Sequence, residues 1–294
     1  MTAAPLLPLA FLVDALAGET VGLRCGDISR PLARLAAAGE RRLNRARRSP
    51  ATRMVRGALA VCLLAGLAAA VGYGLARLAA VVPFLWVLEA LVIAALLDQK
   101  RAFLAVLRLS RRRRKKALSP TMTGEDPYAA PRAALDALSA GYGARLVAGG
   151  FWLVLLGLPG LFAYRAIAVL GAGRTFDMFG QFPARLYLAV SLVPGLLAGL
   201  CLTLASLFAP RAAPRPAAVQ LTLAPADGVA RAVFAGALGL NLGAPGAWVG
   251  PPDGRARVSR TDVQRGLYLY AVAWLIAFGL AAAVTAMTME GFGG

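Results

Sequence analysis

Apolar residues in this chain form long blocks that alternate with polar, arginine-rich segments. A helix of about 20 apolar residues crosses the roughly 30 Å hydrocarbon core of a bilayer. Such blocks, without the short-period alternation of a soluble domain, are typical of membrane spans. The pattern therefore predicts an all-α, polytopic helical membrane protein with cytoplasmic helical regions, built as a single membrane domain over residues 1–294. We expect about five transmembrane helices, over residues 57–76, 81–97, 146–164, 186–208 and 267–289.

The composition agrees with a membrane protein, because 59% of the residues are hydrophobic and the mean hydropathy is +0.66. A formal charge of +18, taken by itself, is typical of proteins that bind nucleic acid. The arginines, however, gather beside the apolar blocks, where they orient the chain and contact anionic membrane lipids. We therefore predict lipid contact and no nucleic-acid partner. The chain contains no histidine, which excludes the commonest general base and metal ligand.

The distribution of arginine also predicts the orientation. Residues 41–56, 100–116 and 211–265 are strongly basic, and basic segments beside spans stay in the cytoplasm. This places the protein in the cytoplasmic (inner) membrane as a multi-pass protein, with the connection 171–185 outside. Alternatively, Pro159 within the sequence LGLPG breaks residues 146–164 into a re-entrant pair of half-helices, which is tolerated where they line a protein cavity. Both interpretations remain open.

Charged residues between or inside the spans are the first candidates for function. Arg174, Asp177 and Arg185 lie in the connection 171–185, and Glu89 lies inside the expected second span. Charges at such places either stay solvated at the interface or line a polar pocket, because burial in lipid is costly. The connection is thus either a solvated loop or part of a site, and Glu89 is either a functional carboxylate or a protonated, inward-facing acid.

The segment 229–250 is rich in glycine but has no Lys-Ser/Thr after the glycines and no clear strand before them. It therefore does not match a phosphate-binding loop. Gly239 and Gly243 form a small-xxx-small pair, which favours close packing of helix backbones.

Four segments together resemble one known family. They are LAFLVDALAGE (residues 9–19), FDMFGQFPARL (176–186), FAGALGLNLGAPGAWVG (234–250) and VSRTDVQR (258–265). In this order, and over nearly the whole chain, they resemble the CobD/CbiB family, the membrane-bound adenosylcobinamide-phosphate synthases of cobalamin biosynthesis. The resemblance implies a polytopic membrane protein that attaches an aminopropanol phosphate to a propionate side chain of a corrinoid by ATP-dependent amide formation.

The resemblance also implies partners and site residues. A corrinoid substrate and other cobalamin-pathway proteins are the implied partners, and ATP with Mg²⁺ the implied cofactors; metal ligands stay unassigned. Carboxylates hold a metal or accept a proton from the amine, and cations neutralise phosphate. On the matching segments, or just before one of them in the case of Arg174, the implied catalytic residues are Asp14, Asp177 and Asp262, and the implied substrate- or phosphate-binding residues are Arg174, Arg185 and Arg265.

The chain departs from the family pattern mainly at polar positions. Phe176 and Gly180 replace an Asp and an Asn, the family's Asn-His-Ser-x-Pro-Asn motif keeps only Pro225, and its polar segment before the central span keeps only Asp136. Two hypotheses follow: an active corrinoid amide ligase, or a non-catalytic membrane scaffold or accessory relative that kept the helical bundle.

Overall fold

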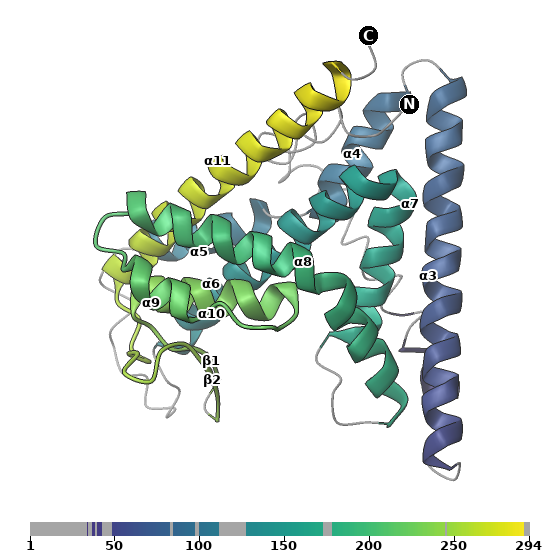
Figure 1. Ribbon diagram of the computed structural model, residues 1–294. Coiled ribbons are helices and arrows are strands. Elements are labelled where there is room, and N and C mark those ends of the chain that lie inside the picture. The colour runs from purple at the N-terminus through teal and green to yellow at the C-terminus, as the bar shows by residue number, and fades with distance from the viewer. Residues whose placement is uncertain are drawn as a thin grey trace. The chain divides into compact units, whose positions relative to one another are not determined.

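The computed structural model describes residues 34, 37–38, 40–42, 49–82, 85–97, 100–111, 128–172, 178–244 and 246–290. These residues are almost entirely helical (Figure 1), which confirms the predicted all-α class. The elements are α3 (Pro50–Val81), α4 (Leu85–Leu97), α5 (Lys100–Arg111), α6 (Ala129–Gly141), the π-helix η1 (Tyr142–Val147), α7 (Ala148–Gly171), α8 (Met178–Phe208), α9 (Pro214–Val219), α10 (Ala226–Leu238), β1 (Leu242–Ala244), β2 (Ala247–Val249) and α11 (Arg260–Glu290).

Four helical stretches in the described part of the chain are long and apolar enough to cross a membrane: residues 50–81, 129–171, 178–208 and 260–287. They cover three of the expected spans fully and a fourth, residues 267–289, as far as Met287, and they identify a multi-pass membrane protein. The other expected span, residues 81–97, is covered by the end of α3 and by α4. Because α4 has 13 residues, it is about 20 Å long and shorter than the hydrocarbon core. The number of crossings stays a prediction.

The chain forms two compact units. Unit 1 contains residues 1–98, 148–192 and 281–294, and unit 2 contains residues 99–147 and 193–280. The predicted organisation as a single domain over residues 1–294 stays a prediction.

In unit 1, α3 packs along α7, and glycines set the spacing of the two helices. A Cβ atom at Gly72 would lie 2.8 Å from the carbonyl oxygen of Leu158, closer than a side chain tolerates. The opposite face of α3 exposes large apolar residues such as Leu63 and Leu67, as expected for a surface in contact with lipid. Small residues therefore bring α3 onto α7, and large ones face away from it.

Helix α7 is broken at Gly157, where φ is 69° and ψ is −158°. Only glycine adopts such a conformation easily. Pro159 follows two residues later and has no N–H to donate to the preceding turn. The break expected in LGLPG is therefore present, at the glycine before the proline. The re-entrant path of this segment stays a prediction.

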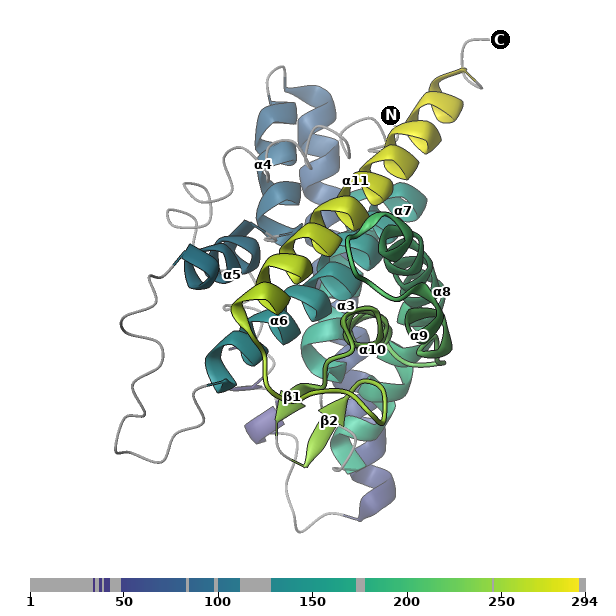
Figure 2. The same ribbon diagram turned by 90° about the vertical axis from the view of Figure 1, so that its left-hand side faces the viewer.

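In unit 2, α10 is buried along most of its length, and aromatic contacts join η1 to α11. Tyr142 is fully buried, its ring lies edge-on to Tyr270 with centroids 5.9 Å apart, and its hydroxyl donates to the carbonyl oxygen of Ala273 at 2.9 Å. The antiparallel hairpin of β1 and β2 follows α10 and lies against α6 (Figure 2). The hairpin therefore packs on α6, and α11 packs on η1, which directly follows α6 in the chain.

The predicted close packing of helix backbones at the Gly239–Gly243 pair is wrong, because α10 ends at Leu238. Gly239 caps α10 in the left-handed conformation, with φ 64° and ψ 38°, and a Cβ atom there would meet nothing within 4 Å. Gly243 lies in β1 with φ 94°. There its Cβ position is 2.5 Å from the carbonyl oxygen of Ala247, so the close packing is within the hairpin. The closely packed glycine of α10 is Gly236, whose Cβ position is 2.6 Å from the carbonyl oxygen of Pro216.

Candidate functional site

The six predicted site residues fall in three places. Asp14, Arg174 and Asp177 lie outside the described residues. Arg185 is exposed on the part of α8 that belongs to unit 1. Asp262 and Arg265 lie together on the first turns of α11, in unit 2. The predicted catalytic and phosphate-binding roles stay predictions; what the structure adds is the surroundings of Asp262.

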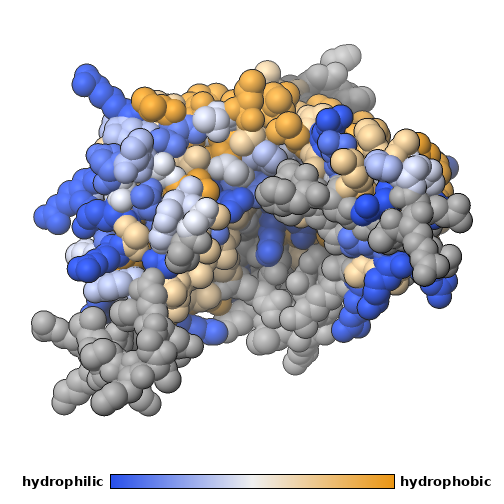
Figure 3. Space-filling model, turned by 90° about the horizontal axis from the view of Figure 1, so that it is seen from below, coloured by the Kyte–Doolittle hydropathy of each residue, from blue (hydrophilic) through white to orange (hydrophobic). Residues whose placement is uncertain are grey.

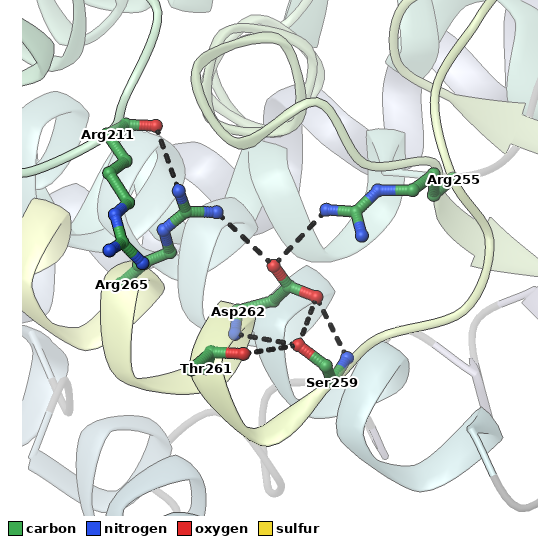
Figure 4. A network of polar contacts seen from close by, with 6 residues as sticks. All are labelled: Arg211, Arg255, Ser259, Thr261, Asp262 and Arg265. Carbon is green, nitrogen blue, oxygen red and sulfur yellow. Dashed lines mark hydrogen bonds and ion pairs between the residues drawn. The ribbon is translucent and has the colours of Figure 1, made fainter.

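Asp262 and Ser259 cap the start of α11 reciprocally. The backbone N–H and the hydroxyl of Ser259 donate to Oδ2 of Asp262, at 2.9 and 2.6 Å. The backbone N–H of Asp262 donates in turn to Oγ of Ser259 at 3.2 Å. Figure 4 shows this exchange at the base of the helix. A Ser followed three residues later by an acid is the pattern that satisfies the free N–H groups of a first turn, so the sequence SRTD starts α11 where it does.

The second carboxylate oxygen of Asp262 binds two arginines. Oδ1 lies 3.4 Å from Nη2 of Arg255 and 3.6 Å from Nη1 of Arg265. Nη2 of Arg265 also donates to the carbonyl oxygen of Arg211 at 3.4 Å (Figure 4). The backbone of Arg211 has a φ of 59°. Such a positive φ is uncommon for residues other than glycine, and residues that adopt it are often found at functional sites.

Because the carboxylate of Asp262 is buried, its role is to hold the arginines around it. The side chain of Asp262 is 3% exposed and that of Arg265 25%, whereas that of Arg255 is 60% exposed. Both oxygens of Asp262 are already engaged by the cap and the ion pairs. Two cations against one anion leave a net positive charge, and Arg255 carries that charge at the surface. The arrangement can therefore hold a guanidinium group in place for an anion from solution.

A second buried support lies under the same loop. Arg132 of α6 is 4% exposed. Its Nε donates to the carbonyl oxygen of Gly243 at 3.0 Å, and its Nη1 to that of Ala256 at 3.1 Å. Its guanidinium lies 4.8 Å from the ring centroid of Trp248, within the range of a cation–π contact. One side chain therefore fastens both the hairpin and the loop before α11 to α6.

Backbone hydrogen bonds fix the loop further. The N–H of Asn241 donates to the carbonyl oxygen of Arg255 at 3.0 Å, and the N–H of Arg255 to that of Gly239 at 3.1 Å. The side-chain amide of Asn241 donates to the carbonyl oxygen of Gly254 at 2.9 Å. Residues 254–256 are thus held from both sides, and Arg255 starts from a fixed backbone.

Arginines gather on the surface around this loop. The left-hand part of Figure 3, where α9, the hairpin and the start of α11 lie in Figure 1, is dominated by hydrophilic side chains. The exposed arginines of this region are Arg211, Arg215, Arg255, Arg257 and Arg260. Such a concentration of one sign attracts anions and raises their local concentration.

A separate charged cluster joins α6 and α10. Arg231 contacts Oδ2 of Asp227 at 2.8 Å, one helical turn away, and Oδ2 of Asp136 at 3.9 Å. Within the described ranges, no three or more Asp, Glu, Cys or His residues gather as a metal site would require. Because Mg²⁺ is usually held by one or two carboxylates together with phosphate oxygens, the Mg²⁺ expectation stays a prediction.

Sequence reasoning missed several residues of this arrangement. The spacing of Ser259 and Asp262 is a sequence signal for the start of a helix. The spacing of Asp227 and Arg231 is a signal for an ion pair along a helix. Arg132 had no such signal, because its partners are 111 and 124 residues away along the chain.

The fold and the arginine-rich end of unit 2 define a polytopic helical membrane protein with a cationic polar region. The model of the CobD/CbiB protein family matches residues 7–270 of the chain. The chain therefore belongs to this family, as its motifs indicated.

Curated relatives of similar length agree. The chain is 30% identical over 275 residues to a protein named "Cobalamin biosynthesis protein CobD" from a Sinorhizobium species, covering 83% of this chain and 85% of the relative. A protein of the same name from Brucella melitensis is 32% identical over 272 residues, covering 81% of each chain. One from Rhodobacter capsulatus is 34% identical over 152 residues, covering 47% of this chain and 48% of the relative. No solved structure matches the chain.

Proposed function

We propose that this protein acts in cobalamin biosynthesis, where it attaches an aminopropanol phosphate to a propionate side chain of a corrinoid by forming an amide. The observation that carries the proposal is the family match over residues 7–270. Relatives named for cobalamin biosynthesis, which align over most of both chains, support it. The corrinoid is accordingly the proposed substrate.

The chemistry of this reaction sets what the chain must supply. Joining a carboxylate to an amine removes water, so the carboxylate must first be activated, which is the chemistry that ATP with Mg²⁺ would bring when bound. The protein has to bind a phosphate ester, orient the amine and accept its proton. The exposed guanidinium of Arg255, held by the buried carboxylate of Asp262, supports the first of these tasks, because guanidinium groups bind phosphate through charge-assisted hydrogen bonds.

The proposed location is the cytoplasmic membrane, with the arginine-rich segments on the cytoplasmic side. Anionic lipids at that surface, and other cobalamin-pathway proteins, are the proposed partners besides the corrinoid. Nucleic acid is not among them, since the arginines accompany apolar helices.

One observation favours a second candidate, a non-catalytic scaffold or accessory member of the family. Asp262, one of the implied catalytic carboxylates, is 2% exposed and has both oxygens bound within the protein. A carboxylate used in this way stabilises the fold and does not contact a substrate.

Complementation separates the two candidates. The gene is expressed in a strain that lacks its own synthase, growth is measured under cobalamin-dependent conditions, and adenosylcobinamide phosphate in the cells is measured by mass spectrometry. We expect growth and product. If the protein accumulates in the membrane but neither growth nor product appears, the synthase proposal is wrong and the accessory role replaces it.

A further inference from the structure

Arg255 has more structural support than a solvated surface arginine needs. Its backbone N–H and carbonyl both bond to the segment after α10, the next carbonyl along is bound by the buried Arg132, and its side chain is held by the buried Asp262. Ordering a long side chain on a surface costs conformational entropy, and an exposed ion pair returns little of it. The support therefore favours a purpose beyond stability.

The Arg255 guanidinium is also open toward solvent. A guanidinium has five N–H donors in a planar fork. Within the described residues, its contact is the single one from Nη2 to Asp262, and 60% of the side chain is exposed. Figure 4 shows the remaining nitrogens of Arg255 pointing to no other labelled residue. Arg265, by contrast, is 25% exposed and already contacts both Asp262 and the carbonyl of Arg211.

We propose that Arg255 binds the phosphate group of a phosphate ester, and that Asp262 is a positioning residue that holds Arg255 for this task. The inference rests on the proposed function for the identity of the ester, an aminopropanol phosphate. It assigns a phosphate contact to Arg255, a residue that is not among the three arginines (Arg174, Arg185 and Arg265) implied by the family resemblance.

The same chemistry has a second source, the phosphate of a lipid headgroup. The apolar part of α11 begins at Leu267, about five residues and therefore about 8 Å after Asp262. Arg255 thus lies near the expected depth of the headgroups. The test must present the soluble ester and the anionic lipid separately.

In the first arm, the full-length protein in nanodiscs of phosphatidylcholine is titrated with aminopropanol phosphate by calorimetry, with aminopropanol as the ligand control. We expect Arg255→Gln to weaken binding by about tenfold to a hundredfold, as for loss of a hydrogen bond to a charged group. Arg257→Gln is the matched control, because Arg257 is also exposed and lies on the same loop. It removes the same charge and should weaken binding less than about threefold.

The role of Asp262 is tested by a double-mutant cycle. Asp262→Asn keeps an oxygen that accepts from Ser259 but removes the charge that holds Arg255. Circular dichroism and size-exclusion chromatography check that the variant is folded. It should weaken binding about tenfold in the parent protein and have almost no effect in the Arg255→Gln protein. A purely structural role would reduce binding in both backgrounds, and this result would overturn the positioning role.

The second arm measures thermal stabilisation by phosphatidylglycerol added to the nanodiscs. If only this stabilisation depends on Arg255, the phosphate bound is that of a lipid. If Arg255→Gln behaves as Arg257→Gln in both arms, the site is refuted. Neither arm needs turnover, so the two proposals can fail separately. If the protein binds the ester through Arg255 but does not complement, only the proposed function is contradicted. If the protein complements but Arg255→Gln binds the ester as well as the parent does, only the site is contradicted.

Discussion

The replacement Arg132→Met removes the buried support under the hairpin and the loop before α11. The parent side chain makes two hydrogen bonds to carbonyl oxygens, at 3.0 and 3.1 Å, and a cation–π contact with Trp248. Bonds from a charged donor contribute about 1.5 kcal/mol each, and the aromatic contact about 1 kcal/mol. Methionine fills most of the same volume and recovers about 1 kcal/mol by burial, so the net loss is about 3 kcal/mol.

We expect this loss to lower the free energy needed to open the hairpin and the loop before α11 locally, because Arg132 connects both to α6. A free energy of about 3 kcal/mol corresponds to about a hundredfold change in an opening equilibrium. Hydrogen–deuterium exchange of the amides of Asn241 and Arg255, which bond across the segment, measures it directly. Arg132→Lys, which keeps the charge but not the planar fork, should give an intermediate increase.

Arg257→Met is the matched control, because it removes the same side chain from an exposed position on the same loop. It should leave exchange at these amides within about threefold of the parent, as usual for surface substitutions. If Arg132→Met and Arg257→Met increase exchange equally, the reasoning about the buried support is wrong.

Three further predictions concern local geometry. Ser259→Ala removes the cap of α11 and should cost about 1 kcal/mol, seen as faster amide exchange in its first turn, whereas unchanged exchange would contradict the cap. Gly72→Ala should lower the midpoint of thermal unfolding, because the added Cβ would meet the carbonyl of Leu158. The control Gly74→Ala, whose Cβ would meet nothing within 4 Å, should leave the midpoint unchanged. Equal midpoints for the two variants would refute the close packing of α3 on α7. Gly239→Ala should lower the stability of the protein by about 1 kcal/mol because Gly239 has a positive φ, and Gly239→Asn should lower it less. An Ala variant as stable as the parent would argue against the left-handed cap.

The parts of the fold that depend on local composition could be predicted from the sequence. Four of the five predicted spans lie on helices long enough to cross a membrane, because hydropathy is a property of each segment alone. The second expected span, residues 81–97, was drawn as one apolar block, although Pro83 within it is a signal for the end of a helix at Val81. The break in α7 was placed at Pro159 because proline is the usual cause, but the residue with non-helical angles is Gly157.

The parts that depend on long-range contacts could not be predicted. Asp262 and Arg265 were found through a family pattern, but their local purpose required the position of Arg255 and the burial of the carboxylate. Arg132 is one arginine among many in the sequence, and only the fold shows that it is buried between α6 and the hairpin. Gly239 and Gly243 show the reverse error, because a spacing typical of helix packing here spans a cap and a strand.

The break in α7 has a consequence for the way the protein is made. A helix interrupted inside a bilayer leaves carbonyl groups without their helical partners, and lipid cannot satisfy them. In unit 1, the backbone at this break is covered by α3, whose Gly72 lies against the carbonyl of Leu158. Because α3 precedes α7 in the chain, the ribosome delivers the cover before the broken segment that needs it. During membrane insertion, α7 can therefore meet its protein partner on arrival and need not wait in lipid with its break uncovered.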